Sequence, residues 1–204
     1  MLRYLLGLYS ELAPETISIG TSVTGKPYVN EKIGGLNFGF NVTHSEHLIA
    51  FAFALETRIG IDVELKTRVG EIAGVVNLFL SSTEKAELRR LLPERRLSAL
   101  LRAWTSKEAL LKAEGIGIAN DLKSVGLSGD FCPRIVSLPK AMGRPSGWSL
   151  YANENEEAVM AIAIRGSGWM VNQRFFTSLE GRYGRGLTCP GIFGPFITRE
   201  RLPG

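Results

Sequence analysis

The segment from residue 58 to residue 65 alternates strictly between apolar side chains and small or charged ones. The apolar positions are Ile59, Ile61, Val63 and Leu65. Because successive side chains of a strand point to opposite faces, we expect a strand whose other face carries Gly60, Asp62 and Glu64. The two carboxylates then stand about 6.5–7 Å apart, at a rise of about 3.3 Å per residue. The chain must therefore bury one face of this strand and display paired acids on the other.

Paired carboxylates suit a hard cation such as Mg²⁺, which also keeps water and phosphate oxygens as ligands. A lone Asp-x-Glu is more often an ordinary acidic strand face. A second segment, residues 102–115, adds to the pattern. On a helix, residues four apart share a face, so Trp104, Glu108 and Lys112 form one stripe with Lys107 beside it. A third carboxylate near two lysines could complete a metal site and meet phosphate, although an exposed Glu–Lys helix pair has the same spacing.

Two further segments could contact phosphate. Residues 40–45 (Phe-Asn-Val-Thr-His-Ser) read as a polar turn before a strand, offering hydroxyls, an imidazole and backbone N–H groups. The segment Gly25-Lys26-Pro27 places a lysine in a turn between extended stretches. Either segment alone is also typical of a surface turn without a function.

The remaining pattern predicts a mixed α and β fold. Ser81 and Glu84 have the spacing of a capping box, and Pro93 separates that helix from a longer one. The expected elements are a helix at 2–12, strands at 48–55 and 58–66, helices at 81–92 and 94–114, and a hairpin formed by 148–151 and 158–164. After Gly166 no period is visible, so we expect a poorly ordered tail outside the core.

Charge and composition exclude some classes of protein. The net charge is +4, and the segment from Arg165 onward holds six arginines against two glutamates, so residues 1–164 are neutral. The body thus has no electrostatic support for nucleic-acid binding, and a basic tail acting on nucleic acid is the weakest hypothesis. No apolar run approaches the eighteen or so residues of a membrane helix. Cys132 and Cys189 fit neither a disulfide framework nor a zinc site, which favours a cytoplasmic protein.

The order and spacing of the four polar segments resemble the 4′-phosphopantetheinyl transferase superfamily, in its larger, surfactin-synthetase-activating type, across residues 2–165. Compared with that type, the chain looks truncated at its N-terminus. The resemblance implies that Asp62, Glu64 and Glu108 ligate Mg²⁺. It also implies that Lys26, His44, Ser45 and Lys112 contact the phosphates of coenzyme A, with Lys107 close enough to help. For the general base, the resemblance implies two candidates, Glu84 and Glu108.

The activity implied is transfer of 4′-phosphopantetheine from coenzyme A to a serine of an apo acyl or peptidyl carrier protein, releasing 3′,5′-ADP. The fold implied is an α+β pseudo-dimer with the active site in a cleft between two similar lobes. The lobes would span residues 1–57 and 58–165, followed by a basic tail at 166–204. We expect a cytoplasmic monomer, a carrier docked near residues 81–92, and Asp62 and Glu108 as surface carboxylates. The alternative is a non-catalytic remnant that binds coenzyme A or carrier protein.

Overall fold

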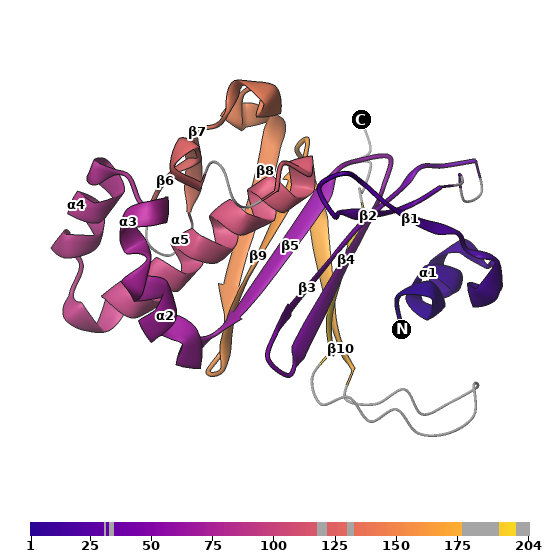
Figure 1. The fold of residues 1–204 in the computed structure, drawn as a ribbon, viewed down its shortest axis with the longest axis horizontal. Helices are drawn as coiled ribbons and strands as arrows, with labels where there is room; N and C mark the ends of the chain where they lie inside the picture. Colours follow the sequence, from indigo (N-terminus) through magenta and orange to yellow (C-terminus); the bar gives the residue numbers. More distant parts are fainter. Residues whose placement is uncertain (31, 33–34, 118–121, 130–132, 177–191, 199–204) are drawn as a thin grey trace.

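The computed structural model describes residues 1–30, 32, 35–117, 122–129, 133–176 and 192–198, and it mixes helices with antiparallel and parallel strands (Figure 1). Cys132 and Cys189 lie outside the described residues. The helices are α1 (Leu2–Ser10), α2 (Val69–Gly74), α3 (Val76–Phe79), α4 (Ser82–Arg90) and α5 (Pro93–Glu114). The strands are β1 (Ile19–Thr21), β2 (Pro27–Val29), β3 (Phe38–Ser45), β4 (Leu48–Leu55), β5 (Ile59–Leu65), β6 (Gly126–Ser128), β7 (Arg134–Ser137), β8 (Trp148–Glu154), β9 (Ala158–Arg165), β10 (Met170–Phe176) and β11 (Ile192–Thr198).

Two sheets pack face to face, and each is covered on its outer side by a helix (Figure 1). The first sheet has the strand order β10-β11-β4-β3, and the second has the order β5-β9-β8. Helix α1 packs on the first sheet against aromatic side chains that include Phe40, Phe51 and Phe53. Helix α5 packs on the second sheet, against Val159, Ala161 and Ala163 of β9. The layers therefore run helix, sheet, sheet, helix.

Strand β5 lies between the first sheet and α5, and all seven of its residues are buried. The apolar face predicted from the sequence packs against the alanines of β4, which leave room for Ile, Val and Leu side chains. The other face lies under α5. A Cβ built on Gly60 would lie 2.0 Å from the backbone oxygen of Ala109 and 2.4 Å from the nitrogen of Ala113. Gly60 therefore allows the helix to approach the strand closely.

Residues 38–45 form strand β3, so the prediction of a polar turn at 40–45 is wrong. The backbone of this segment pairs with β4 over its whole length, and the alternating Asn41, Thr43 and Ser45 all point toward β5. The Asn41 Oδ1 accepts from the backbone N–H of Ile61 at 2.8 Å, and the Ser45 Oγ accepts from that of Leu65 at 3.2 Å. These side chains satisfy the backbone donors at the edge of the second sheet, which would otherwise be buried without partners.

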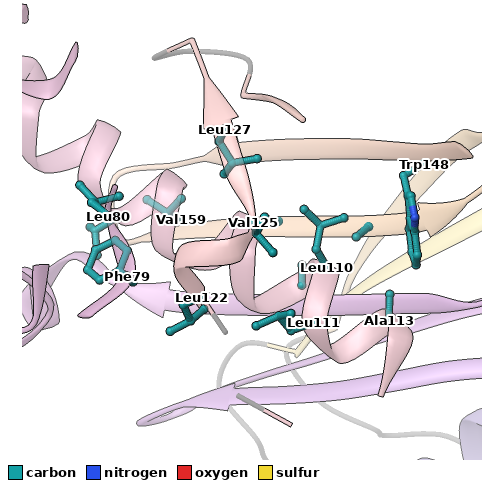
Figure 2. Packing of buried hydrophobic residues seen from close by; sticks show 14 of the residues in the cluster. Phe79, Leu80, Leu110, Leu111, Ala113, Leu122, Val125, Leu127, Trp148 and Val159 are labelled. Atoms are coloured by element: carbon teal, nitrogen blue, oxygen red, sulfur yellow. The ribbon is translucent and has the colours of Figure 1, made fainter. Parts of the chain in front are cut away.

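Helices α4 and α5 form as the sequence predicts. The capping box is present, with Ser81 and Glu84 each accepting from the other's backbone N–H. Pro93 occupies the first turn of α5, where a missing N–H costs nothing. Gly115 ends the helix in the left-handed conformation at a φ of 78°. The buried side of α5, with Leu110, packs among residues from α3, β6 and β9 (Figure 2).

The segment after Gly166 differs from its prediction. Residues 170–176 and 192–198 are strands: β10 pairs with β11, and β11 pairs in parallel with β4. Without β11, the edge of β4 opposite β3 would present unpaired backbone groups. Four of residues 192–197 are Ile or Phe, which suits a strand beside this edge, but Gly194, Pro195 and the neighbouring glycines hide the pattern in the sequence. Of the helices described, none combines the length and apolarity needed to cross a bilayer.

Candidate active site between β3, β5 and α5

Asp62 is the centre of a buried polar group. Its side chain projects from β5 toward α5 and is part of a residue only 3% exposed. Its Oδ1 accepts a hydrogen bond from the Thr43 hydroxyl at 3.0 Å and one from the Lys112 ammonium at 2.5 Å. No described residue donates to its buried Oδ2. Buried carboxylate oxygens are nearly always hydrogen-bonded, so an open one marks a position where a ligand can bind.

Glu108 lies one helical turn before Lys112 and shares its ammonium, with Nζ 3.6 Å from Glu108 Oε2. Burial, followed by the nearby charge of Asp62, raises the pKa of Glu108 to about 7. Burial also raises the pKa of Asp62 to about 6, although Lys112 opposes the rise. Burial disfavours the charge of Lys112, but Asp62 and Glu108 outweigh it and raise the Lys112 pKa. One lysine therefore does not fully compensate the two acids, and a further cation would favour their ionised forms.

Glu64, two residues beyond Asp62 on β5, is held by three donors. Its Oε2 accepts from the Ser45 hydroxyl at 2.9 Å and from the Arg68 guanidinium at 2.7 Å. Its Oε1 accepts from the indole N–H of Trp104 at 3.2 Å. Trp104 also packs edge-on against Phe79, with ring centroids 5.0 Å apart. The ring is thereby fixed, and with it the direction of the Glu64 carboxylate.

The side chains around Asp62 meet some of the requirements of the implied Mg²⁺ and not others. Within the part of the chain that the structure describes, no three His, Cys, Asp or Glu side chains are gathered closely enough to hold a metal ion. Two features nevertheless fit a hard cation. The atoms that would ligate it are all carboxylate oxygens, and Asp62 Oδ2 is buried without a hydrogen bond from any described residue. The pKa values of Asp62 and Glu108 are both raised, which indicates that the site holds too little positive charge to balance the two carboxylates. The chemistry of the side chains therefore fits the ion, while their arrangement does not gather three carboxylates around one point, and Glu64 already accepts from Ser45, Arg68 and Trp104.

The expectation of surface carboxylates is wrong. Asp62 and Glu108 are 3% and 4% exposed, because β5 is covered on its polar face by α5 and flanked by β3. The alternation in the sequence identifies only which residues share a face of the strand, so it does not indicate that α5 covers that face. Substitutions here must therefore be judged for their effect on folding as well as on chemistry.

Lys107 and Glu84 lie apart from this group and form a buried ion pair of their own. The Lys107 side chain is 0% exposed, and its ammonium donates to Glu84 and to the backbone oxygens of Phe79 and Leu122. These three acceptors use all three of its protons. Burial opposes ionisation of Glu84, but donation from Lys107 and from two backbone N–H groups lowers its pKa. As placed, the pair connects α4 with α5 and offers nothing to a phosphate.

Lys26 and His44 are likewise not gathered with Asp62. The Lys26 ammonium donates to the backbone oxygens of Ile59, Lys112 and Ala113, which fastens the β1–β2 turn to the end of α5. Burial, then the neighbouring Arg58, lowers the pKa of Lys26 to about 8. His44 is exposed and alternates with Thr43 and Ser45 along β3, so it faces the opposite way. Lys26 also lines a hollow of about 330 Å³.

Three residues for which the sequence predicted no individual role take part in the group. Thr43 binds Asp62, Trp104 binds Glu64, and Arg68 neutralises Glu64 from four residues further along the chain. Thr43 could have been found from its alternation with Asn41 and Ser45, had the segment been read as a strand. Arg68 has no such signal, since its contact depends on the turn Lys66–Arg68 that follows β5.

Comparisons with known proteins identify the family of this chain. Residues 58–163 match the family described as the 4′-phosphopantetheinyl transferase superfamily. The chain is 30% identical over 170 residues to the 4′-phosphopantetheinyl transferase HetI of Nostoc sp., a match covering 83% of this chain and 69% of HetI. It is 35% identical over 91 residues to the 4′-phosphopantetheinyl transferase AcpT of Salmonella typhi, covering 45% of this chain and about half (46%) of AcpT.

A solved structure, the holo-[acyl-carrier-protein] synthase of Helicobacter pylori in complex with coenzyme A, aligns with 53% of this chain and 99% of its own, at 20% identity and a TM-score of 0.44. The range that matches the family, residues 58–163, begins at β5 and ends in β9. It therefore contains the strand and the helix that carry Asp62, Glu64, Glu108 and Lys112. The chain belongs to the 4′-phosphopantetheinyl transferase superfamily.

Proposed function

We propose that the protein transfers the 4′-phosphopantetheine group of coenzyme A to a serine of an apo carrier protein, giving holo carrier protein and 3′,5′-ADP. The observation that carries this proposal is the buried group of Asp62, Glu108 and Lys112, with one carboxylate oxygen left open. Family membership supports the same reaction. A merely binding remnant has no need of a buried, charge-deficient group of this kind.

In this mechanism Asp62, Glu64 and Glu108 would hold Mg²⁺, which supplies charge neutralisation for the coenzyme A pyrophosphate. Lys112 holds Asp62 in place through Oδ1 and presents positive charge beside the phosphates. The serine oxygen attacks the β-phosphorus, the bond from that phosphorus to the bridging oxygen breaks, and 3′,5′-ADP leaves. The serine proton passes to a carboxylate oxygen. Glu108 is the better placed candidate because it lies beside Lys112 and Asp62, whereas Glu84 is held by Lys107.

The nucleotide would lie toward the hollow of about 330 Å³ that Lys26 and Arg58 line at the end of α5. To contact its phosphates, Lys26 would have to give up one of its backbone acceptors, and His44 would have to be reached from the face of β3 that points away from Asp62. We further propose that the two layers form two similar lobes, since α1 covers the β3–β4 pair much as α5 covers the β5–β9 pair. The expectation of a cytoplasmic monomer stays part of the proposal.

The carrier would dock at the corner between α4 and α5. Four arginines, residues 89, 90, 95 and 96, lie there with Glu87 and Glu94, and Leu92 and Leu97 are exposed beside them. A largely apolar hollow of about 250 Å³ opens beside them between α4, α5 and β6. The hollow itself is lined by Glu84, Glu87 and Arg102 among apolar side chains, and the four arginines lie outside it. Basic side chains beside an apolar hollow suit an acidic partner that inserts an apolar side chain. The carrier is therefore expected to be acidic.

The test is to incubate the purified chain with coenzyme A, Mg²⁺ and several apo carriers, and to weigh the carriers by mass spectrometry. We expect a gain of one phosphopantetheine that is lost with EDTA and with Asp62→Asn. Glu157→Gln, which removes a half-exposed carboxylate paired with His47, is the matched control and should keep full activity. No gain on any carrier by a folded protein would contradict the proposal.

A further inference from the structure

Arg68 bridges two carboxylates of different exposure. It ends the 3₁₀ turn Lys66–Arg68 directly after β5. One guanidinium nitrogen lies 2.7 Å from Glu64 Oε2, and the other two lie 2.9 Å and 3.1 Å from Glu71 Oε2 in α2. The Arg68 side chain is 34% exposed, Glu71 is 69% exposed, and Glu64 is 9% exposed. The arginine therefore joins a buried acid of the candidate site to an acid at the surface.

We propose that Arg68 competes with the divalent cation for Glu64. Arg68 neutralises Glu64 when no cation is bound, and when a cation binds it leaves Glu64 and keeps only its contacts to Glu71. The inference rests on the proposed function, because it takes Glu64 as a metal ligand. It adds a residue that sets the affinity for the metal without ligating it. Arg68 is thus a positioning residue that acts through Glu64.

The three carboxylates of the site are not equivalent, and Arg68 accounts for the difference. Asp62 keeps a buried oxygen open, whereas Glu64 has Oε2 occupied by Ser45 and Arg68 and Oε1 by Trp104. The two neutral donors, Ser45 and Trp104, can stay when a cation binds, since each carboxylate oxygen accepts more than one contact. The guanidinium cannot stay unopposed, because its charge repels a divalent ion a few ångströms away.

Glu71 makes the transfer possible. Its Oε2 already accepts two hydrogen bonds from Arg68, and it lies three residues further along the chain at the surface. When the cation replaces the guanidinium at Glu64, Arg68 keeps the Glu71 contacts and needs only to turn outward. In the empty site Arg68 keeps the buried Glu64 charge paired, and a buried unpaired charge is strongly unfavourable. One arginine therefore serves both states.

The experiment is a titration of the full chain, freed of metal by chelation, with Mg²⁺ by calorimetry and with Mn²⁺ by electron paramagnetic resonance. Arg68→Gln should tighten binding about threefold or more, an effect of the size expected for a partly exposed ion pair. Glu71→Gln should weaken it, because Arg68 then stays on Glu64. Arg68→Lys, which keeps the charge, should remain near the wild type.

The double variant separates this competition from a general charge effect. With Arg68→Gln already present, Glu71→Gln should change metal affinity little, because no guanidinium remains to be transferred. An equal weakening in both backgrounds would show that Glu71 acts through space alone and would overturn the proposal. Unchanged or weaker binding by folded Arg68→Gln would also overturn it. If Arg68→Gln does not fold, as circular dichroism will show, unchanged affinity in Glu71→Gln is enough to reject the transfer.

Failure of the proposed function gives a different result. Wild-type chain that binds neither ion would overturn the metal assignment and this inference together. Metal binding that Asp62→Asn abolishes, but that does not respond to Arg68→Gln, would overturn the competition alone. Carrier modification in the mass assay is read separately from either titration.

Discussion

The ammonium nitrogen of Lys112 lies 2.5 Å from Oδ1 of Asp62, which joins the last turn of α5 to the strand beneath it. The same ammonium is 3.6 Å from Glu108. Lys112 therefore has two effects that a substitution would remove together. It compensates two buried acids, and it supplies positive charge at the place proposed for phosphate.

Replacing Lys112 with Met should lower both stability and turnover. Removing one partner of a buried ion pair leaves a charge unpaired, which costs about 3–5 kcal/mol in a fully buried site. Lys112 is 21% exposed, so we expect about 1–3 kcal/mol by urea denaturation. Turnover of the folded fraction should fall by about 10²-fold or more. Full turnover in a folded Lys112→Met protein would contradict the role at phosphate.

Gly60→Ala should destabilise the fold strongly. The added methyl would lie 2.0 Å from the Ala109 oxygen, and this neighbour is backbone, so the helix must shift away from the strand. We expect a loss of about 3 kcal/mol or more in free energy of unfolding. Gly70→Ala in α2 is the control, because a Cβ there meets nothing within 4 Å. The control should be neutral or gain up to about 1 kcal/mol; equal losses in both variants would rule out the packing argument.

Glu84→Gln distinguishes a structural role from a role as general base. Its carboxylate pairs with buried Lys107 and accepts backbone N–H groups of Ser81 and Leu127. The variant should lose about 2–4 kcal/mol of stability, while the folded fraction keeps turnover within a few-fold of wild type. If Glu84 accepted the serine proton, turnover would instead fall by about 10²-fold or more with the protein folded. Urea denaturation and the carrier mass assay, run on the same samples, give the two numbers.

The pKa of Lys26 predicts a rise of stability in alkali. Burial lowers its pKa from 10.5 to about 8 in the folded chain. Between these two values the unfolded chain binds more protons at this residue than the folded chain does, so the free energy of unfolding should increase with pH from about 8 to 10.5. Lys26→Met should remove this contribution and give a smaller increase. Identical pH dependence in both proteins, measured by urea denaturation, would show that the Lys26 pKa is not lowered.

The sequence was sufficient for elements whose ends carry their own chemistry. The Ser81–Glu84 capping box, Pro93 and Gly115 fix α4 and α5 through local contacts, and the alternation in β5 identifies the side chains that share a face. It was not sufficient where the environment of a side chain depends on a partner far along the chain. The polar side chains of Asn41–Ser45 find their partners on β5, and the burial of Asp62 depends on α5. Lys107 and Lys112 look equivalent in the sequence, yet one is paired with Glu84 and the other with Asp62.

The same limit applies to the α4–α5 corner. In the sequence, residues 89–96 are the end of one helix and the start of the next, and only the fold shows that their four arginines share one corner. Arg89→Glu with Arg90→Glu should raise the KM for an acidic carrier about tenfold or more and leave kcat nearly unchanged, because both side chains are exposed and neither contacts Asp62. The wild-type KM should rise with salt, and the variant's much less. Lys140→Glu with Arg144→Glu, an equally exposed pair in the β7–β8 connection, makes the same charge change and should leave KM nearly unaltered. Equal increases in both double variants would mean that only net charge attracts the carrier, and the corner would lose its place as the docking surface.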